Sequence, residues 1–301
     1  MKLYFSPAYA GSGYAFETTR KSQWVAQSLD SDPIAGLALC APQPLSIEQV
    51  EQVHDADYVR ALRTGVPLEL AQSQGFTWDA GLWPMVLASN GGAVAAALDA
   101  LQSGLSGSLS SGLHHARRSQ GYGYCSLNGL VLAARAALAA GARSVLILDL
   151  DAHCGGGSAG LIAGAPDIWQ LDVSVDDYDR YESSDRVRLS MVHRADDYLG
   201  AIERELQQLW TRAPRFDLCL YNAGMDPFQG CPDGGLQGIT REILAARERL
   251  VFKACRERKL PLAFSLAGGY IGEQLDQAGL VDLHRLTLSA AAQSERAGRP
   301  S

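Results

Sequence analysis

The sequence has little of what several common protein classes require. None of its six cysteines lies in a Cys-x-x-Cys pair, and a chain of 301 residues is far larger than the small secreted domains that need disulfides. The first apolar run is broken by Ser6 and Pro7, so it is too short for the core of a secretory signal. We therefore expect reduced thiols and a cytoplasmic protein.

Positive charge is also scarce. The chain has 26 Lys and Arg against 33 Asp and Glu, which leaves a formal net charge of −7. This balance gives no broad electrostatic reason to bind nucleic acid or anionic lipid, so we expect neither a nucleic-acid nor a membrane partner. The longest apolar stretch, residues 84–101, contains Asn90 and Asp99, which a bilayer core would penalise. It is predicted to be a buried helix.

What the sequence does contain is the pattern of a parallel sheet. Hydrophobic residues make up 47%, enough for a sizeable core, and from about residue 126 short apolar runs alternate with longer helical patterns. The predicted strands cover residues 2–5, 144–150, 168–173, 216–221 and 260–267. The predicted helices cover residues 20–29, 46–54, 58–63, 84–101, 129–140, 198–210 and 239–258. We expect one α/β domain over residues 1–293, with a central sheet that is mainly parallel and flanked by helices, and a flexible tail over 294–301.

Polar side chains follow the predicted strands, where ligands of parallel sheets gather. Asp149, Asp151 and His153 alternate at the end of one strand, so period-2 geometry points them to the same side. Asp226 follows the next strand but one, and Tyr270 follows the last.

Two carboxylates and one imidazole suit a catalytic divalent metal better than a closed structural site. Asp151, His153 and Asp226 are the candidate ligands, for Zn²⁺ or alternatively Fe²⁺. Asp149 is better placed behind a neighbouring histidine, and the pair His114 and His115 lies upstream.

Each of these motifs has an ordinary structural explanation when taken alone. An Asp-x-Asp-x-His segment can serve turn chemistry, and an Asp before Pro227 is typical of a turn. The glycines at 155, 157 and 160 also form the G-x-G-x-x-G pattern of dinucleotide-binding proteins. That pattern needs its first glycine at the strand end, whereas residues 151–154 intervene here, so we disfavour it.

Taken together, these residues resemble the histone deacetylase superfamily of zinc-dependent amidohydrolases, which has the arginase/deacetylase α/β fold. The resemblance is closest to class IV-like and bacterial members. Five stretches carry it in family order: VHDADYVRAL (53–62), GLHHARRSQGYGYCSLN (112–128), LILDLDAHCGGG (146–157), YNAGMDP (221–227) and LAGGY (266–270).

The resemblance implies roles for individual residues. Asp151, His153 and Asp226 would bind zinc, and Tyr270 would donate a hydrogen bond to the oxyanion. His114 and His115 would stand beside the metal-bound water, with Asp149 paired to His114. A monovalent cation, usually potassium, would lie near Asp149, the main chain around Asp151 and His153, and the Ser174 side chain.

Two positions depart from the family pattern. Gly156 stands where many members carry an acidic residue, or Asn in class IV, that orients the second histidine, so we expect His115 to lack its usual partner. Cys154 stands where His or Gln is common. We interpret it as a small packed residue, with a redox-sensitive thiol as the alternative.

The implied reaction is hydrolysis of an acyl amide, with an acyl-lysine peptide or protein as substrate. Two alternatives remain at this stage. One is an amidohydrolase for acetylpolyamines or other small acylated amines, and the other is a protein that binds acyl ligands without catalysis. The motifs leave the acyl chain length and the oligomeric state open.

Overall fold

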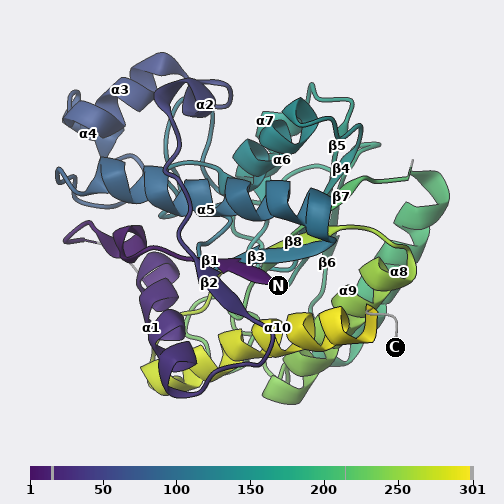
Figure 1. Ribbon diagram of the computed structural model, residues 1–301. Helices are drawn as coiled ribbons and strands as arrows, with labels where there is room; N and C mark the ends of the chain where they lie inside the picture. The colour runs from purple at the N-terminus through teal and green to yellow at the C-terminus, as the bar shows by residue number, and fades with distance from the viewer. Residues whose placement is uncertain (15–16, 214, 299–301) are drawn as a thin grey trace.

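A computed structural model describes residues 1–14, 17–213 and 215–298, and these residues form helices on both faces of one parallel sheet (Figure 1). The sheet has eight strands in the order β2-β1-β3-β8-β7-β4-β5-β6, and every neighbouring pair is parallel. The strands are β1 Lys2–Tyr4, β2 Ala38–Cys40, β3 Leu105–Ser108, β4 Val145–Asp149, β5 Ile168–Ser174, β6 Val187–Met191, β7 Leu218–Ala223 and β8 Leu262–Leu266.

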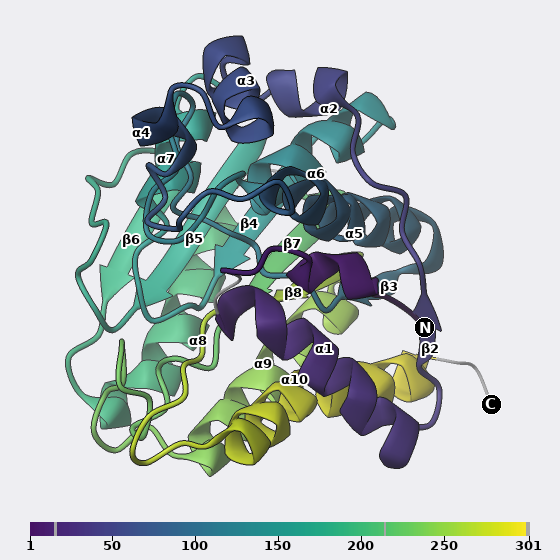
Figure 2. The same cartoon turned by 90° about the vertical axis from the view of Figure 1, so that its left-hand side faces the viewer.

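The helices form the two outer layers. Helices α2 to α7 lie on one side of the sheet, and α1, α8, α9 and α10 lie on the other (Figures 1 and 2). Their bounds are η1 Pro7–Ala10, α1 Glu17–Ser31, α2 Ile47–Glu51, α3 Ala56–Thr64, α4 Leu68–Ala71, α5 Leu82–Ser103, α6 Gly129–Ala139, α7 Gly156–Ile162, α8 Ala195–Arg212, α9 Arg241–Glu257 and α10 Gln277–Gly298. The predicted fold class, a parallel α/β sheet flanked by helices, is confirmed.

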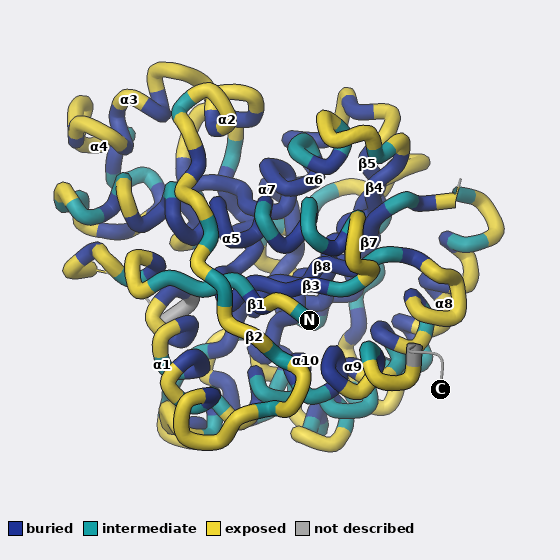
Figure 3. The backbone as a smooth tube through the Cα atoms, viewed as in Figure 1, coloured by how far each residue is buried: buried dark blue, intermediate teal, exposed yellow. Residues whose placement is uncertain are grey.

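The core consists of two hydrophobic clusters, one on each face of the sheet. Successive side chains of strand β4 point to opposite faces of the sheet and so enter different clusters. Val145 and Ile147 pack into the cluster under α5 and α6, whereas Leu146 and Leu148 pack into the cluster under α8 to α10. All residues of β4 are buried, as expected for a parallel strand covered on both faces (Figure 3). Its apolar run is therefore continuous rather than alternating.

Helix α5 is long and apolar enough to pass a test for a membrane span by length and hydropathy. In the fold, 67% of its most apolar 18-residue window is buried against the rest of the protein. The sequence-based prediction of a buried helix over residues 84–101 agrees with this position.

The first residues of the predicted tail from Ser294 are helical in the structure. Helix α10 continues through Ser294 to Gly298, and the rest of the predicted tail, residues 299–301, lies outside the described residues. Two contacts extend the helix: Arg256 Nη1 donates to Ser294 Oγ at 3.2 Å, and the amino group of Met1 donates to Glu295 Oε1 at 3.0 Å. Both partners are distant in the sequence, so a pattern of small and charged residues could not reveal them.

Candidate active site

Three predicted metal ligands meet at the carboxyl edge of the sheet. Asp151 and His153 follow β4, and Asp226 follows the adjacent strand β7. One ligand atom from each residue lies within 4.8 Å of the others, and all three side chains are buried. His153 Nδ1 lies 3.1 Å from Asp151 Oδ1 and 3.2 Å from Asp226 Oδ2. The structure therefore brings the three residues together as the sequence predicted.

Backbone amides hold one oxygen of each carboxylate and leave the other facing His153. Gly268 N donates to Asp151 Oδ2 at 2.7 Å, and Ala152 N donates to Asp226 Oδ1 at 3.0 Å. Among the described residues, Asp226 Oδ2 is buried and accepts no hydrogen bond. A Cβ on Gly268 would overlap this oxygen, so only glycine permits the close approach.

The electrostatics of this cluster favour a bound cation. Burial and the Asp151 charge raise the pKa of Asp226 to about 7, because two buried carboxylates this close repel each other when both are ionised. Two carboxylates and an imidazole are a donor set that Zn²⁺ and Fe²⁺ use in catalytic sites, and Asp226 Oδ2, which accepts no hydrogen bond among the described residues, is available as a ligand. The residues present thus fit a divalent metal.

His114 and His115 stand beside these ligands, on the segment that follows β3. Both are buried, and their Nε2 atoms lie 3.1 Å apart. His114 Nδ1 donates to Asp149 Oδ2 at 2.7 Å, and Asn222 Nδ2 donates to Asp149 Oδ1 at 2.8 Å. Burial would lower the pKa of His114, but Asp149 and Asp151 outweigh it and raise this pKa to about 10. His114 is therefore held as a cation.

His115 has no partner at position 156, as expected from Gly156, but an acidic residue from elsewhere in the chain contacts it. His115 Nδ1 donates to Asp179 Oδ2 at 2.8 Å. Asp179 lies in the loop after β5, far from position 156 in sequence, so spacing within the LILDLDAHCGGG motif could not reveal it. Burial and the charge on His114 lower the pKa of His115 to about 4, against the opposing effect of Asp179. His115 is therefore neutral near pH 7.

Tyr270 lies beside the metal ligands, after strand β8. Its ring centroid is 6.3 Å from that of His153, with the ring planes at 68°. Tyr270 N donates to Cys231 Sγ at 3.3 Å, which fixes the backbone next to Gly269. Burial and the nearby Asp226 raise the pKa of Tyr270 well above its usual value, so its hydroxyl keeps the proton that a donor needs.

An acidic residue that the sequence reasoning missed lies beside Asp149, one of the residues predicted to bind a monovalent cation. Asp172 pairs with Asp149 across β4 and β5, and burial together with the Asp149 charge raises the pKa of Asp172 well above its usual value. Ser174 Oγ donates to the His153 carbonyl at 3.4 Å. Asp172 sits inside an apolar strand, and only the pairing of two strands reveals that it faces Asp149.

Two tyrosines that the sequence reasoning also missed flank the histidine pair. The rings of Tyr122 and Tyr178 stack with centroids 5.4 Å apart and planes at 7°. The Tyr178 ring also lies 5.1 Å from His115 and is 40% exposed, so it stands between the site and solvent. Asp233 is exposed as well, with Oδ1 3.6 Å from His153 Nε2.

Cys154, the second departure from the family pattern, is a packed residue. It is fully buried, and its Sγ donates to the Asp176 carbonyl at 3.4 Å. Burial raises the pKa of its thiol to about 12, which leaves almost no reactive thiolate near pH 7. The packing interpretation is therefore preferred to the redox one.

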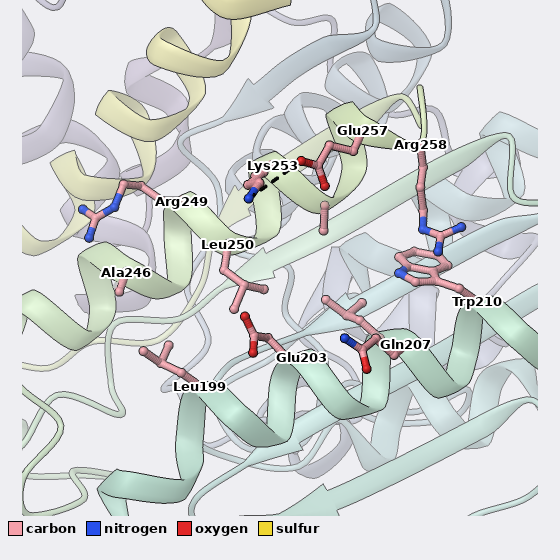
Figure 4. Close-up of a pocket in the computed structure, with 12 residues that line it drawn as sticks. Leu199, Glu203, Gln207, Trp210, Ala246, Arg249, Leu250, Lys253, Glu257 and Arg258 are labelled. Atoms are coloured by element: carbon pink, nitrogen blue, oxygen red, sulfur yellow. Dashed lines mark ion pairs between the residues drawn. The ribbon is translucent and has the colours of Figure 1, made fainter.

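A hollow lies elsewhere on the molecule. A cavity of about 1090 Å³ runs between α8 and α9, where Leu250 and Trp210 border it and Lys253 pairs with Glu257 at 3.8 Å (Figure 4). None of its lining residues belongs to the metal-ligand or histidine cluster. The buried metal donors are instead at the carboxyl edge of the sheet.

Comparisons with known proteins agree with this site. The family model described as "Histone deacetylase domain" matches residues 15–281. An uncharacterised protein of Picosynechococcus is 33% identical over 73% of this chain and 75% of its own length. Histone deacetylase 2 of Arabidopsis thaliana is 29% identical over 60% of this chain, and human histone deacetylase 1 is 33% identical over 38%. The matched regions cover 48% and 26% of those two deacetylases.

Solved structures share the fold. The HDA15 HD domain superposes with a TM-score of 0.78 at 17% identity, over 99% of this chain and 94% of its own. The acetylpolyamine aminohydrolase of Burkholderia pseudomallei superposes with a TM-score of 0.79 at 19% identity, over the whole of both chains. At these identities the likeness concerns the arrangement of the chain.

Proposed function

Since the chain belongs to the histone deacetylase family, we propose that it is a metal-dependent hydrolase of acyl amides whose substrate is an N-ε-acyl-lysine side chain. The observation that carries this proposal is the convergence of three buried metal donors with two histidines that lie 3.1 Å apart and are each hydrogen-bonded to a carboxylate of their own. A site that merely bound an acyl group would have no need for two histidines that are each oriented by a buried carboxylate.

The chain's own residues divide the reaction between them. A divalent ion held by Asp151, His153 and Asp226 would act as a Lewis acid on the carbonyl and lower the pKa of a bound water. His115, neutral and with Nε2 facing the site, takes the proton of the attacking water.

Asp149, His114 and Tyr270 would act in the later part of the reaction. Asp149 keeps His114 cationic beside His115, so that the histidine pair can return a proton to the leaving amine. Tyr270 donates its hydroxyl hydrogen to the carbonyl oxygen as charge develops on it. Its raised pKa suits this task, since a tyrosinate could only accept.

We also propose a monovalent cation, with potassium as the candidate, beneath the metal ligands. Asp149 and Asp172 lie side by side in the sheet, and a Cβ on Gly155 would sit 2.8 Å from an oxygen of the first and 3.2 Å from one of the second. Two buried carboxylates on neighbouring strands repel each other when both are ionised, and a bound cation would offset this repulsion. Asp172 thus joins the predicted donors Asp149, Ser174 and the main chain of Asp151 and His153.

A second candidate substrate class is supported by one observation. Asp233 places an exposed carboxylate 3.6 Å from His153, at the edge of the site, where it would attract a positively charged amine. Acylated small amines such as acetylpolyamines fit this charge, and a solved acetylpolyamine aminohydrolase shares the fold.

The proposal is tested by one panel of substrates. Zinc-loaded protein is incubated with an acetyl-lysine peptide, longer acyl-lysine peptides and acetylpolyamines, and the released amine is measured. We expect release from acyl-lysine peptides. Release from acetylpolyamines alone would favour the second candidate, and stoichiometric zinc with no release from any amide would leave a binding protein. Asp151→Ala is the control that removes the metal.

A further inference from the structure

We infer that Asp179 is the positioning carboxylate of His115, and that it takes over from the loop after β5 the role that the family resemblance gives to position 156. This inference rests on the proposed acid–base role of His115. It adds a residue from a separate segment of the chain, which neither the motifs nor the comparisons single out.

The carboxylate of Asp179 is held by donors from separate segments. Its Oδ2 accepts from His115 Nδ1 at 2.8 Å and from Gly157 N at 3.1 Å, and its Oδ1 accepts from Arg117 Nη2. The side chain is 2% exposed although the loop around it lies at the surface. A loop carboxylate buried with this many donors is held in one orientation.

The backbone of the loop is set to aim this side chain inward. Asp179 has a φ of 60°, a left-handed conformation that is uncommon outside glycine and costs free energy. The residue before Asp179 is held by two hydrogen bonds. Cys154 N donates to the Tyr178 carbonyl at 3.0 Å, and Tyr178 N donates to Asp176 Oδ1 at 2.8 Å. The strained residue is therefore the one that contacts the catalytic pair.

Gly156 explains why the carboxylate comes from this loop. A Cβ at position 156 would overlap the carbonyl oxygen of Asp179 and lie 2.6 Å from its Oδ1. A side chain at 156 and Asp179 in its present position thus exclude each other. The glycine that seemed to remove the partner of His115 makes room for a partner from elsewhere.

The hydrogen bond from His115 fixes the tautomer of its ring. A carboxylate can only accept, so Nδ1 carries the proton and Nε2 keeps its lone pair. That lone pair faces the Nε2 of His114, which is 3.1 Å away, next to the metal ligands. Arg117 balances the charge of the carboxylate and so leaves the proton on His115. Asp179 thereby leaves Nε2 as the one ring nitrogen of His115 that can accept a proton.

The tautomer itself is the test. Nitrogen-15 spectra of zinc-loaded, histidine-labelled protein resolve which ring nitrogen carries the proton, and a His115→Gln variant assigns the signal among the six histidines. We expect His115 to be protonated at Nδ1 alone in the wild type. In Asp179→Asn, whose amide can donate as well as accept, we expect the other tautomer to appear. We also expect kcat to fall about 10²-fold while KM and zinc content stay unchanged.

The matched control is Asp177→Asn, an exposed position of the same loop, which should leave both tautomer and kcat as in the wild type. An Nε2-protonated His115 in the wild type would overturn the inference, and this outcome does not depend on whether Asp179→Asn folds. An unchanged tautomer and kcat in a folded Asp179→Asn would overturn it too. If the wild type hydrolyses no amide, the proposed function fails, and the tautomer still decides the role of Asp179.

Discussion

Tyr270 shows how one residue can separate binding from turnover. It lies beside His153 without being one of the metal ligands, and its hydroxyl keeps its proton. Tyr270→Phe should therefore retain zinc and KM while kcat falls by about 10² to 10³. Steady-state kinetics together with metal analysis check this. A fully active Tyr270→Phe would rule out the oxyanion role.

Gly268 is the position where the metal site depends on a missing side chain. A Cβ there would overlap Asp226 Oδ2 and lie 2.7 Å from Asp151 Oδ2. We predict that Gly268→Ala displaces Asp226 and weakens zinc binding by at least 10-fold, on the order of what is seen when groups supporting metal ligands are removed. A zinc titration measures the effect.

The control for this substitution is Gly160→Ala in α7, where an added Cβ would meet no atom within 4 Å. It should bind zinc as the wild type does. Equal zinc affinity of both alanine variants would contradict the assignment of Asp226 as a ligand.

Asp233 provides a prediction about substrate charge. Its carboxylate is exposed at the edge of the site, beside His153. Asp233→Asn should lower kcat/KM several-fold more for acetylpolyamines than for an uncharged acyl-lysine peptide, because the loss of support for His153 affects both substrates whereas the loss of charge affects only the charged one. The ratio of the two values, measured at low and high salt, is the readout. An unchanged ratio would contradict the proposed role of Asp233, on which the second candidate substrate class depends.

At the scale of elements, the segment between α2 and α3 supports the histidine loop through His54. Its Nδ1 donates to the Arg117 carbonyl at 2.8 Å, and its Nε2 accepts from Asn128 N at 3.0 Å. Burial lowers the pKa of His54 to about 4, compared with about 6.5 in an unfolded chain. The unfolded state therefore binds more protons than the folded state between these values, and stability falls as the pH drops through this window.

The size of this effect is measurable. From pH 7 to pH 5, His54 should account for a loss of about 2 kcal/mol in the free energy of unfolding. Urea denaturation at the two pH values should show a smaller loss in His54→Gln, which keeps a donor and an acceptor. His193→Gln, at an exposed position, should behave as the wild type. If His54→Gln showed the full loss, His54 would not be the titrating group.

The elements also show what the sequence could predict. Strands β4, β5, β7 and β8 are continuous apolar runs, because both of their faces are covered, and such runs are visible without any structure. Strand β3 has the sequence LSGS, and its glycine packs against the ring of Phe264, so its strand character comes from neighbours. Strands β2 and β6 and helix α10 were likewise not predicted.

The site residues divide in the same way, into those that a sequence pattern reveals and those that depend on contacts with distant segments. Asp151, His153, Asp226 and Tyr270 lie just after predicted strands, so a rule about strand ends found them. Asp172 required the pairing of β4 with β5, and Asp179 required the path of a loop that no period describes. Residues placed by long-range contacts were the ones that sequence reasoning missed.

At the scale of the whole molecule, one sheet edge assembles the site. The loops after β3, β4, β5, β7 and β8 contribute the histidine pair, the metal ligands, Asp179 and Tyr270, from positions 114 to 270. A domain boundary within this range would divide the site, and we propose residues 1–293 as one catalytic domain. The net charge of −7 includes buried acids at this edge, among them Asp149 and Asp172, and therefore overstates the charge on the surface.

The central claim is that Asp151, His153 and Asp226 hold one divalent ion on which amide hydrolysis depends. Its most direct test is amine release from an acyl-lysine peptide by protein stripped of metal and then titrated with Zn²⁺. We predict that activity disappears on stripping and returns in proportion to added zinc, up to one equivalent per chain. Full activity in the stripped protein, or no activity at any zinc ratio from a folded protein, would contradict the claim.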